Sequence, residues 1–226
     1  ADRARPARRS GRGATATRRV DDAQAEALRA LAKANGATLY ATLLAAFQVL
    51  LSRLSGSQDV VLGTPVANRH HLDVEGVVGF FVNTLVLRAR PQPEQSFDAW
   101  LRQVQSDVLR AIAHQDYPFD QLVELLQPER DLSRTPLFQT MFALRNQGIE
   151  PPLVDLGDVR ARGLPLLDNE QSRFDLSATV RDGGDAMHVE FEYSLDLFDA
   201  ATIDAWLDLY LRILEQAGAA PQRSLA

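Results

Sequence analysis

Cysteine is absent from the 226 residues, so the chain can form no disulfide framework, no zinc–thiolate site and no cysteine nucleophile. Its four histidines show no metal-ligand spacing. No stretch reaches the roughly 18 apolar residues that a membrane span needs. Acidic side chains outnumber basic ones, 30 to 24, and the formal net charge of −6 argues against general nucleic-acid binding. Neither a membrane nor a nucleic acid is therefore expected as a partner.

Signatures of nucleotide binding and of hydrolysis are missing as well. The sequence has no Walker loop, no GxGxxG turn and no GxSxG nucleophile elbow. Serine, histidine and aspartate are all present, but the histidines form no constellation with them that resembles a hydrolase triad. The sequence therefore gives no support to a nucleotide-binding domain or a serine hydrolase.

The chain does have enough apolar material for a core, since 46% of its residues are hydrophobic. The mixed order of helices and strands predicts an α/β fold with a mixed sheet covered on one face by helices. Helices are expected from Asp21 or Asp22 to Gly36, from Thr38 to Gly56, from Ser96, from Pro118 to about Leu126, and from near Ala200. Strands are expected at 59–66, 80–90, 137–145, 174–181 and 186–193, the last two as a hairpin.

The N-terminal stretch differs in charge from the rest of the chain. Residues 1–19 carry seven arginines against one acid, Asp2, so the remainder has a net charge of about −12 (−6 minus +6). A basic arm can bind nucleic acid, but no aromatic residues interleave with these arginines for stacking on bases. A solvated linker is the expected structure, with residues 1–20 as linker and residues 21–226 as the folded subdomain.

Three motif-like segments follow one another along the chain. The first is GTPVANR at 63–69, followed by VGFFVNTL at 78–85 and by Arg88; the second is HQDYPFD at 114–120; the third is RDLSRTPLF at 130–138. A short FDL at 174–176 and the closing Tyr193, Leu197 and Phe198 come after them. In this order the segments resemble the late motifs of the condensation domains of nonribosomal peptide synthetases. One departure is Asp120, where the family usually has glutamate. The resemblance covers nearly the whole chain.

The resemblance implies a chloramphenicol-acetyltransferase-like lobe, the second of two in such a domain. The family forms an amide bond when an aminoacyl amine on a downstream peptidyl carrier protein attacks an acyl thioester on an upstream one. The implied partners are the N-terminal lobe, both carrier proteins and an adjacent adenylation domain. No cofactor is expected to bind directly, because the phosphopantetheine arms belong to the carriers. Residues 1–20 then become an interlobe linker and 21–226 the C-terminal subdomain of a bacterial, cytoplasmic protein.

The catalytic HHxxxDG motif of the family lies in the first lobe, which this chain does not contain. Residues 70–76 read HHLDVEG and nearly match that motif, with Glu75 in place of aspartate. Histidine suits proton transfer near neutral pH, so His71 could be interpreted as a general base. The segment falls between two later motifs, where the family has a variable loop, and a surface loop is the expected structure. No catalytic residue is expected in this chain, which alone should be inactive.

The resemblance assigns supporting roles to the motif residues. Arg69 is expected to pair with the aspartate of HHxxxDG across the lobe interface, since a buried carboxylate needs such a partner. Asn83 and Thr84 either line the tunnel or tie down a neighbouring loop. The remaining candidates are His114, Gln115 and Asp116, with Asp116 as a helix cap, and Arg130, Asp131, Ser133 and Arg134, which are expected to brace a loop.

Two other functions stay open from the sequence. Some relatives have lost catalysis, so the chain could belong to a condensation-like binding module that recruits a carrier protein or a partner enzyme. A free-standing acyltransferase with an alcohol acceptor is a third possibility, and the motifs at 114–120 and 130–138 argue against it. An intact HHxxxDG in the missing lobe would favour the enzyme over the binding module.

Overall fold

A six-stranded mixed sheet organises the computed structural model, which describes residues 1–69, 72–129, 131–146, 153–155, 157–162, 170–184 and 186–226. The strand order is β1-β8-β7-β4-β2-β3; β2 with β4 and β4 with β7 run parallel, and the other neighbours are antiparallel. The strands are β1 (Gly13–Val20), β2 (Val60–Val66), β3 (Asn83–Ala89), β4 (Thr140–Arg145), β7 (Leu176–Asp182) and β8 (Met187–Ser194). The predicted mixed sheet is confirmed.

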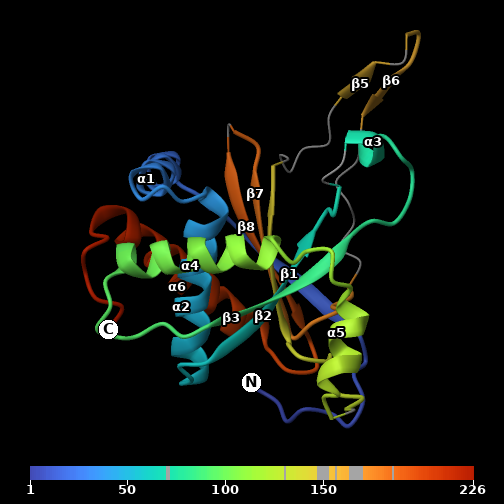
Figure 1. The fold of residues 1–226 in the computed structure, drawn as a ribbon, viewed down its shortest axis with the longest axis horizontal. Helices are drawn as coiled ribbons and strands as arrows, with labels where there is room; N and C mark the ends of the chain where they lie inside the picture. Colours follow the sequence, from blue (N-terminus) through green and yellow to red (C-terminus); the bar gives the residue numbers. More distant parts are fainter. Residues whose placement is uncertain (70–71, 130, 147–152, 156, 163–169, 185) are drawn as a thin grey trace.

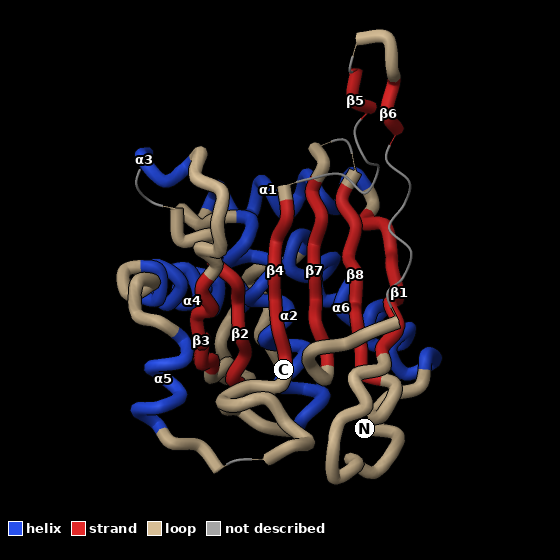
Figure 2. Tube along the Cα trace, turned by 90° about the vertical axis from the view of Figure 1, so that its right-hand side faces the viewer, coloured by secondary structure: helices blue, strands red, loops and turns tan. Residues whose placement is uncertain are grey.

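Helices cover one face of this sheet, as predicted. Figure 2 looks onto the other face, which we call the open face, with α1, α2, α4 and α6 behind the strands. A separate two-stranded sheet of β5 (Leu153–Asp155) and β6 (Arg160–Arg162) stands away from the main sheet (Figure 1). The helices are α1 (Asp22–Ala34), α2 (Leu39–Ser55), α3 (Leu72–Glu75), α4 (Phe97–Ile112), α5 (Phe119–Leu126) and α6 (Ala200–Ala219).

Local capping explains where the first two helices begin and end. The Asp21 side chain accepts a hydrogen bond from the Ala23 N–H at 2.9 Å, and the Thr38 hydroxyl accepts one from the Ala41 N–H at 3.1 Å. Both bonds satisfy backbone donors that have no partner inside the helix. Gly56 ends α2 in the left-handed region, at φ 66°, where a residue without a side chain is favoured. These boundaries confirm the predicted ones.

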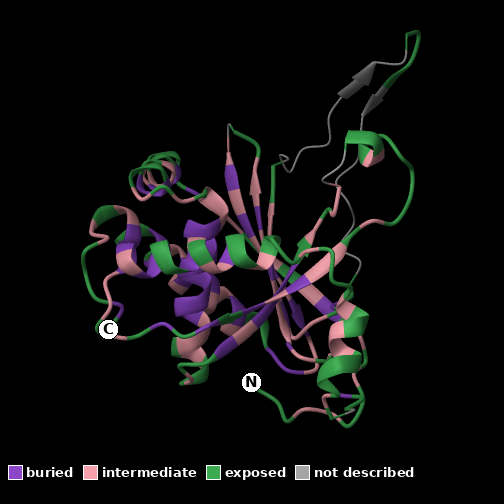
Figure 3. Cartoon of the chain, viewed as in Figure 1, coloured by how far each residue is buried: buried purple, intermediate pink, exposed green. Residues whose placement is uncertain are grey.

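The core lies between the helices and the sheet (Figure 3). Along β8 the side chains alternate, with Met187, Val189 and Phe191 buried and their neighbours partly exposed, as expected for a strand with one covered face. Phe47 of α2 lies fully buried among these side chains, and its ring centroid is 5.9 Å from that of Phe191. The fully buried Tyr210 of α6 donates its hydroxyl proton to a backbone carbonyl of α2 at 2.9 Å.

The N-terminal stretch is not a solvated linker, so this prediction is wrong. Residues 13–20 form β1, which pairs with β8 along its whole length, from Gly13 opposite Ser194 to Val20 opposite Met187. Residues before β1 bond to loops of the same subdomain, as when the backbone N–H of Asp2 donates to the Leu197 carbonyl at 2.8 Å. The ATAT run of β1 alternates in side-chain size. Because alanine and threonine differ little in hydrophobicity, the alternation was too weak to predict a strand.

Two predicted strands are shorter than expected. Residues 80–82 lie outside β3 and residues 137–139 outside β4. Leu137 has φ 66°, a left-handed conformation that no regular strand contains. The loop before β4 therefore continues further than its hydrophobic residues indicate.

Within the described ranges, no single helix is long and apolar enough to cross a membrane. The consecutive helices α1 and α2, bent by 105° where they meet, would pass that criterion only as a pair, by length and composition.

Candidate functional site

Three phenylalanine rings from distant segments pack together, and we call them the aromatic cluster: Phe119, Phe138 and Phe174. The ring centroids of Phe119 and Phe138 lie 5.7 Å apart, and those of Phe138 and Phe174 lie 5.5 Å apart, which is within the range of favourable ring contacts. Beneath Phe138 lies Gly63 of β2, where an added Cβ would come within 2.3 Å of the ring. Residues of four motif segments, GTPVANR, HQDYPFD, RDLSRTPLF and FDL, therefore meet at one place beside β2.

We expect Gly63→Ala to destabilise the chain, because the new methyl group occupies the place of the Phe138 ring. Overpacking of this kind typically costs about 1–3 kcal/mol, and a chain of this size loses roughly 2–4 °C of melting temperature per kcal/mol. Gly76→Ala is the matched control, since a Cβ at Gly76 meets no atom within 4 Å. Thermal melting of both variants measures the effect. Equal melting temperatures for the two would contradict this packing.

Asn83, the first residue of β3, anchors the segment that precedes α5. Its Nδ2 donates to the backbone carbonyls of Gln115 and Tyr117, each at 2.8 Å, and its Oδ1 accepts from the Phe119 N–H at 3.1 Å. These bonds use both donors and one acceptor position of the side-chain amide. This geometry ties the neighbouring loop to the sheet, whereas a tunnel-lining role for Asn83 stays a prediction.

The cap of α5 differs from the one predicted. Pro118 occupies the N-cap position, not Asp116, and the helix N–H that follows is met by Asn83 from β3. A proline fits there because its fixed φ is compatible with a helix start. His114 is exposed, and its backbone N–H donates to the Ala111 carbonyl at 3.1 Å. Thr84 is half-buried and, by strand alternation, lies on the open face.

The described part of the third motif, residues 131–138, forms a braced loop that we call the motif loop. The Asp131 carboxylate accepts from the Ser133 N–H at 2.7 Å and lies 3.4 Å from the Arg134 guanidinium. Hydrogen bonds from Ser133 lower the pKa of Asp131, so its carboxylate stays charged. Ser133 itself is buried. Arg130, which was expected in the same network, lies outside the described residues.

Arg69 holds the segment that follows β2. Its guanidinium donates to the backbone carbonyls of Val74, of Glu75 at 3.2 Å and of Gly79 at 3.3 Å. The guanidinium carbon also lies 4.2 Å from the centre of the Phe81 ring, a cation–π contact. Arg69 therefore fixes the fold of the loop that carries α3.

No carboxylate among the described residues lies within ion-pair distance of Arg69. Its expected pairing with a carboxylate of the first lobe stays a prediction. The neighbouring Asn68 has φ 53°, and its side-chain oxygen is buried without a hydrogen-bond partner in the described part of the chain. His70 and His71 lie outside the described residues.

The loop held by Arg69 exposes large apolar side chains, which we call the apolar ridge: Leu72, Val77, Val78, Phe80 and Val82. Val78 is 99% exposed and Phe80 is 92% exposed. Figure 3 shows the region of α3 largely in the colour of exposed residues. Contiguous exposed apolar side chains often mark an interaction surface.

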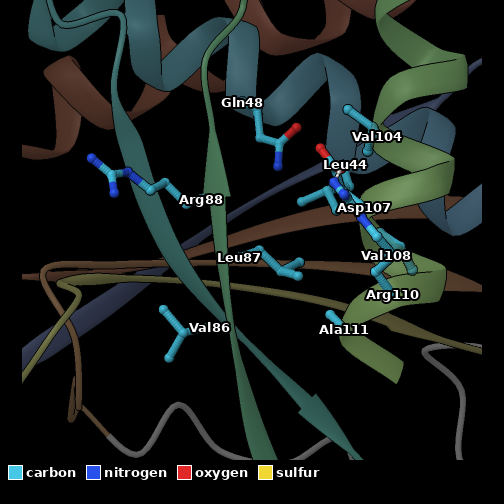
Figure 4. Close-up of a pocket in the computed structure, with 10 residues that line it drawn as sticks. All are labelled: Leu44, Gln48, Val86, Leu87, Arg88, Val104, Asp107, Val108, Arg110 and Ala111. Carbon is cyan, nitrogen blue, oxygen red and sulfur yellow. Dashed lines mark hydrogen bonds and ion pairs between the residues drawn. The ribbon is translucent and has the colours of Figure 1, made fainter. Parts of the chain in front are cut away.

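A pocket of about 190 Å³ opens between α2, α4 and β3 (Figure 4). Gln48 is 3% exposed there, and its Oε1 has no hydrogen-bond partner within the described ranges. Asp107 and Arg110 of α4 pair with each other beside it. The pocket contains none of the predicted site residues, so it is separate from the aromatic cluster.

A second pocket, of about 210 Å³, lies against β2, β3 and β4. The Tyr40 hydroxyl at its wall donates to the Thr64 hydroxyl at 2.8 Å. Burial raises the pKa of Tyr40 to about 12, so its phenol stays protonated and cannot serve as a base near neutral pH. No group of three or more histidine and acidic side chains among the described residues could hold a metal ion.

Comparison with known proteins gives a consistent result. The family model described as "Condensation domain" matches residues 1–226. Surfactin synthase subunit 1 of Bacillus subtilis is 39% identical over 228 residues, which cover 100% of this chain and 6% of that protein. Bacitracin synthase 3 of Bacillus licheniformis is 38% identical over 226 residues, again over 100% of this chain and 4% of that protein.

Solved structures also resemble the fold of this chain closely. The crystal structure of holo-AB3403, a four-domain nonribosomal peptide synthetase, has a TM-score of 0.91 and 26% identity, over 99% of this chain and 18% of that one. The X-domain from teicoplanin biosynthesis has a TM-score of 0.88 and 27% identity, over 99% of this chain and 51% of that one. The chain thus spans less than a tenth of these curated relatives and about half of the X-domain structure.

Proposed function

Because this chain belongs to the condensation-domain family of nonribosomal peptide synthetases, we propose that it is the second lobe of a domain that forms amide bonds. The observation that supports this proposal most is the meeting of four motif segments at Gly63 and the aromatic cluster. A packed cluster to which several motifs contribute fits the wall of a tunnel. The role of residues 1–20 as the connection between the two lobes, and a cytoplasmic location, stay predictions.

The proposed substrates are two carrier proteins, each with a phosphopantetheine arm. The amine on the downstream arm attacks the thioester carbonyl on the upstream arm, so a C–N bond forms, the C–S bond breaks and the thiol leaves. The proton of the amine passes to a base, which in this family is the histidine of the first lobe, and from the base to the leaving sulfur, which departs as the thiol. The second lobe, formed by this chain, contributes orientation of the reactants and exclusion of water, and both are recognised sources of rate enhancement. An adjacent adenylation domain is a further expected partner.

The apolar ridge is proposed to pack against the first lobe. Val78 and Phe80 are almost fully exposed in this chain, and the chain spans about half of the related X-domain structure. Arg69 holds the loop that carries the ridge by donating hydrogen bonds to the Glu75 and Gly79 carbonyls. A carboxylate of the first lobe next to Arg69 would complete this interface.

The proposal is tested with a two-lobe domain that contains this chain. Offered donor-loaded and acceptor-loaded carrier proteins, it should give a dipeptide that mass spectrometry detects. Replacing the second histidine of the first-lobe HHxxxDG with alanine should lower the rate by on the order of 10²–10⁴, the usual contribution of a general base. A two-lobe domain with intact HHxxxDG and folded carriers that yields no dipeptide would overturn the proposal.

A second candidate is a binding module without catalysis. It is favoured by the resemblance to the X-domain of teicoplanin biosynthesis, which has been solved in a complex with OxyB, with a TM-score of 0.86 and 27% identity to this chain. Such a module would bind a carrier protein or a partner enzyme and form no dipeptide. The same assay separates the two candidates, because only the enzyme gives product.

A further inference from the structure

We propose that Arg5 is a positioning residue that clamps the motif loop to the start of β7, an inference that rests on the proposed function. The Arg5 guanidinium donates to both carboxylate oxygens of Asp175, one of them at 3.1 Å. It also donates to the Ser133 carbonyl at 3.0 Å. One side chain of the N-terminal segment therefore joins two motif segments that are 42 residues apart (175 minus 133).

The clamp differs from the other ion pairs of the N-terminal segment in its burial. The side chains of Arg5 and Asp175 are 23% and 13% exposed, whereas those of Arg3 and Asp199 are 48% and 55% exposed. Exposed pairs contribute little because water and salt screen them. A two-pronged arginine–carboxylate bond that is shielded from water is stronger and fixes geometry in two directions.

Both partners of Arg5 are directly connected to the aromatic cluster. Phe174 immediately precedes Asp175, and its ring stacks on Phe138 in the motif loop. The backbone of Asp175 is also bonded to the sheet, since its carbonyl accepts from the Ser194 N–H of β8 at 3.0 Å. Asp175 is thus the fixed side of the clamp, and loss of the Arg5 bonds would loosen the motif loop that carries Phe138.

The motif loop needs such an external restraint. Leu137 has φ 66°, and a left-handed non-glycine residue costs free energy that the surroundings must offset. Phe138 follows directly and presses on Gly63 of β2, the strand that leads to Arg69. The clamp thus supports the Phe138 ring where it packs against β2.

The first test is kinetic and uses the two-lobe domain. We expect Arg5→Ala to lower kcat by about tenfold or more with little change in KM, because small misplacements of an active-site surface can cost on the order of 10²-fold in rate. Arg5→Lys should restore part of the loss, since an ammonium group can pair with Asp175 but lacks the planar fork that also reaches Ser133. Arg8→Ala, at an exposed position of the same segment with the same change in charge, is the matched control and should behave as wild type.

The second test is independent of activity. Hydrogen exchange in the same domain should be faster at the backbone amides of residues 133–135, 137 and 138 in Arg5→Ala and unchanged in Arg8→Ala; Pro136 has no amide hydrogen. If the wild-type domain makes no dipeptide, the proposed function fails, but the exchange result still shows whether Arg5 restrains the motif loop. Unchanged hydrogen exchange in Arg5→Ala would overturn the positioning role. So would a kcat of Arg5→Ala equal to that of the wild type, measured at a temperature well below the melting temperature of the variant.

Discussion

Offered both loaded carrier proteins, this chain alone is expected to form no dipeptide above the uncatalysed background. Bringing the amine and the thioester together in the correct geometry can contribute about 7–11 kcal/mol to lowering the barrier. That requires a closed tunnel, and the proposed second wall and the histidine are both in the first lobe. Adding the first lobe in trans should restore product, measured by mass spectrometry. Product from the chain alone would show that the family resemblance has misled the assignment of the catalytic group.

The apolar ridge provides the control for this complementation. Val78 and Phe80 are exposed in the isolated chain, so the chain should self-associate when no first lobe is present. The double substitution Val78→Ser and Phe80→Ser should keep the chain monomeric by light scattering and should weaken complementation. Unimpaired complementation by this variant would exclude the ridge as the lobe contact.

Helix boundaries were predictable because their causes are local. Asp21, Thr38 and Gly56 each act on backbone groups within a few residues, and the structure places all three where the sequence predicts. The other five strands of the main sheet follow from runs of β-branched and aromatic residues, and their predicted positions differ only at the ends. The short strands β5 and β6 were not predicted. The family resemblance added the fold of the lobe, which the comparisons confirm.

The features that the sequence could not predict depend on long-range contacts. Arg5 and Asp175 are 170 residues apart, so no local pattern could pair them. The three phenylalanines of the aromatic cluster each belong to a recognised motif, which was a usable signal, but their contact depends on the sheet register. Asn83 reaches the start of α5 from a neighbouring strand, so a local cap by Asp116 was the wrong expectation.

Replacing Arg69 with alanine is expected to lower stability more in the two-lobe domain than in this chain alone. In this chain the substitution removes the bonds to the Glu75 and Gly79 carbonyls and the contact with Phe81. Their loss destabilises the loop that carries the apolar ridge. In the two-lobe domain it should also leave the first-lobe aspartate buried and unpaired, which typically costs about 3–5 kcal/mol. Thermal melting of both forms, together with dipeptide formation, measures the two contributions separately.

Arg88→Ala serves as the matched control, because Arg88 pairs with Asp59 at the surface, with side chains 60% and 39% exposed. An exposed pair of this kind is worth about 0–1 kcal/mol, and its loss should be the same in both forms. The loss from Arg69→Ala should be larger in the two-lobe domain than in this chain, and that excess is the interlobe pair. If Arg69→Ala lowers stability equally in both forms and leaves dipeptide formation at the wild-type rate, Arg69 only holds its own loop, and the first-lobe aspartate must have another partner.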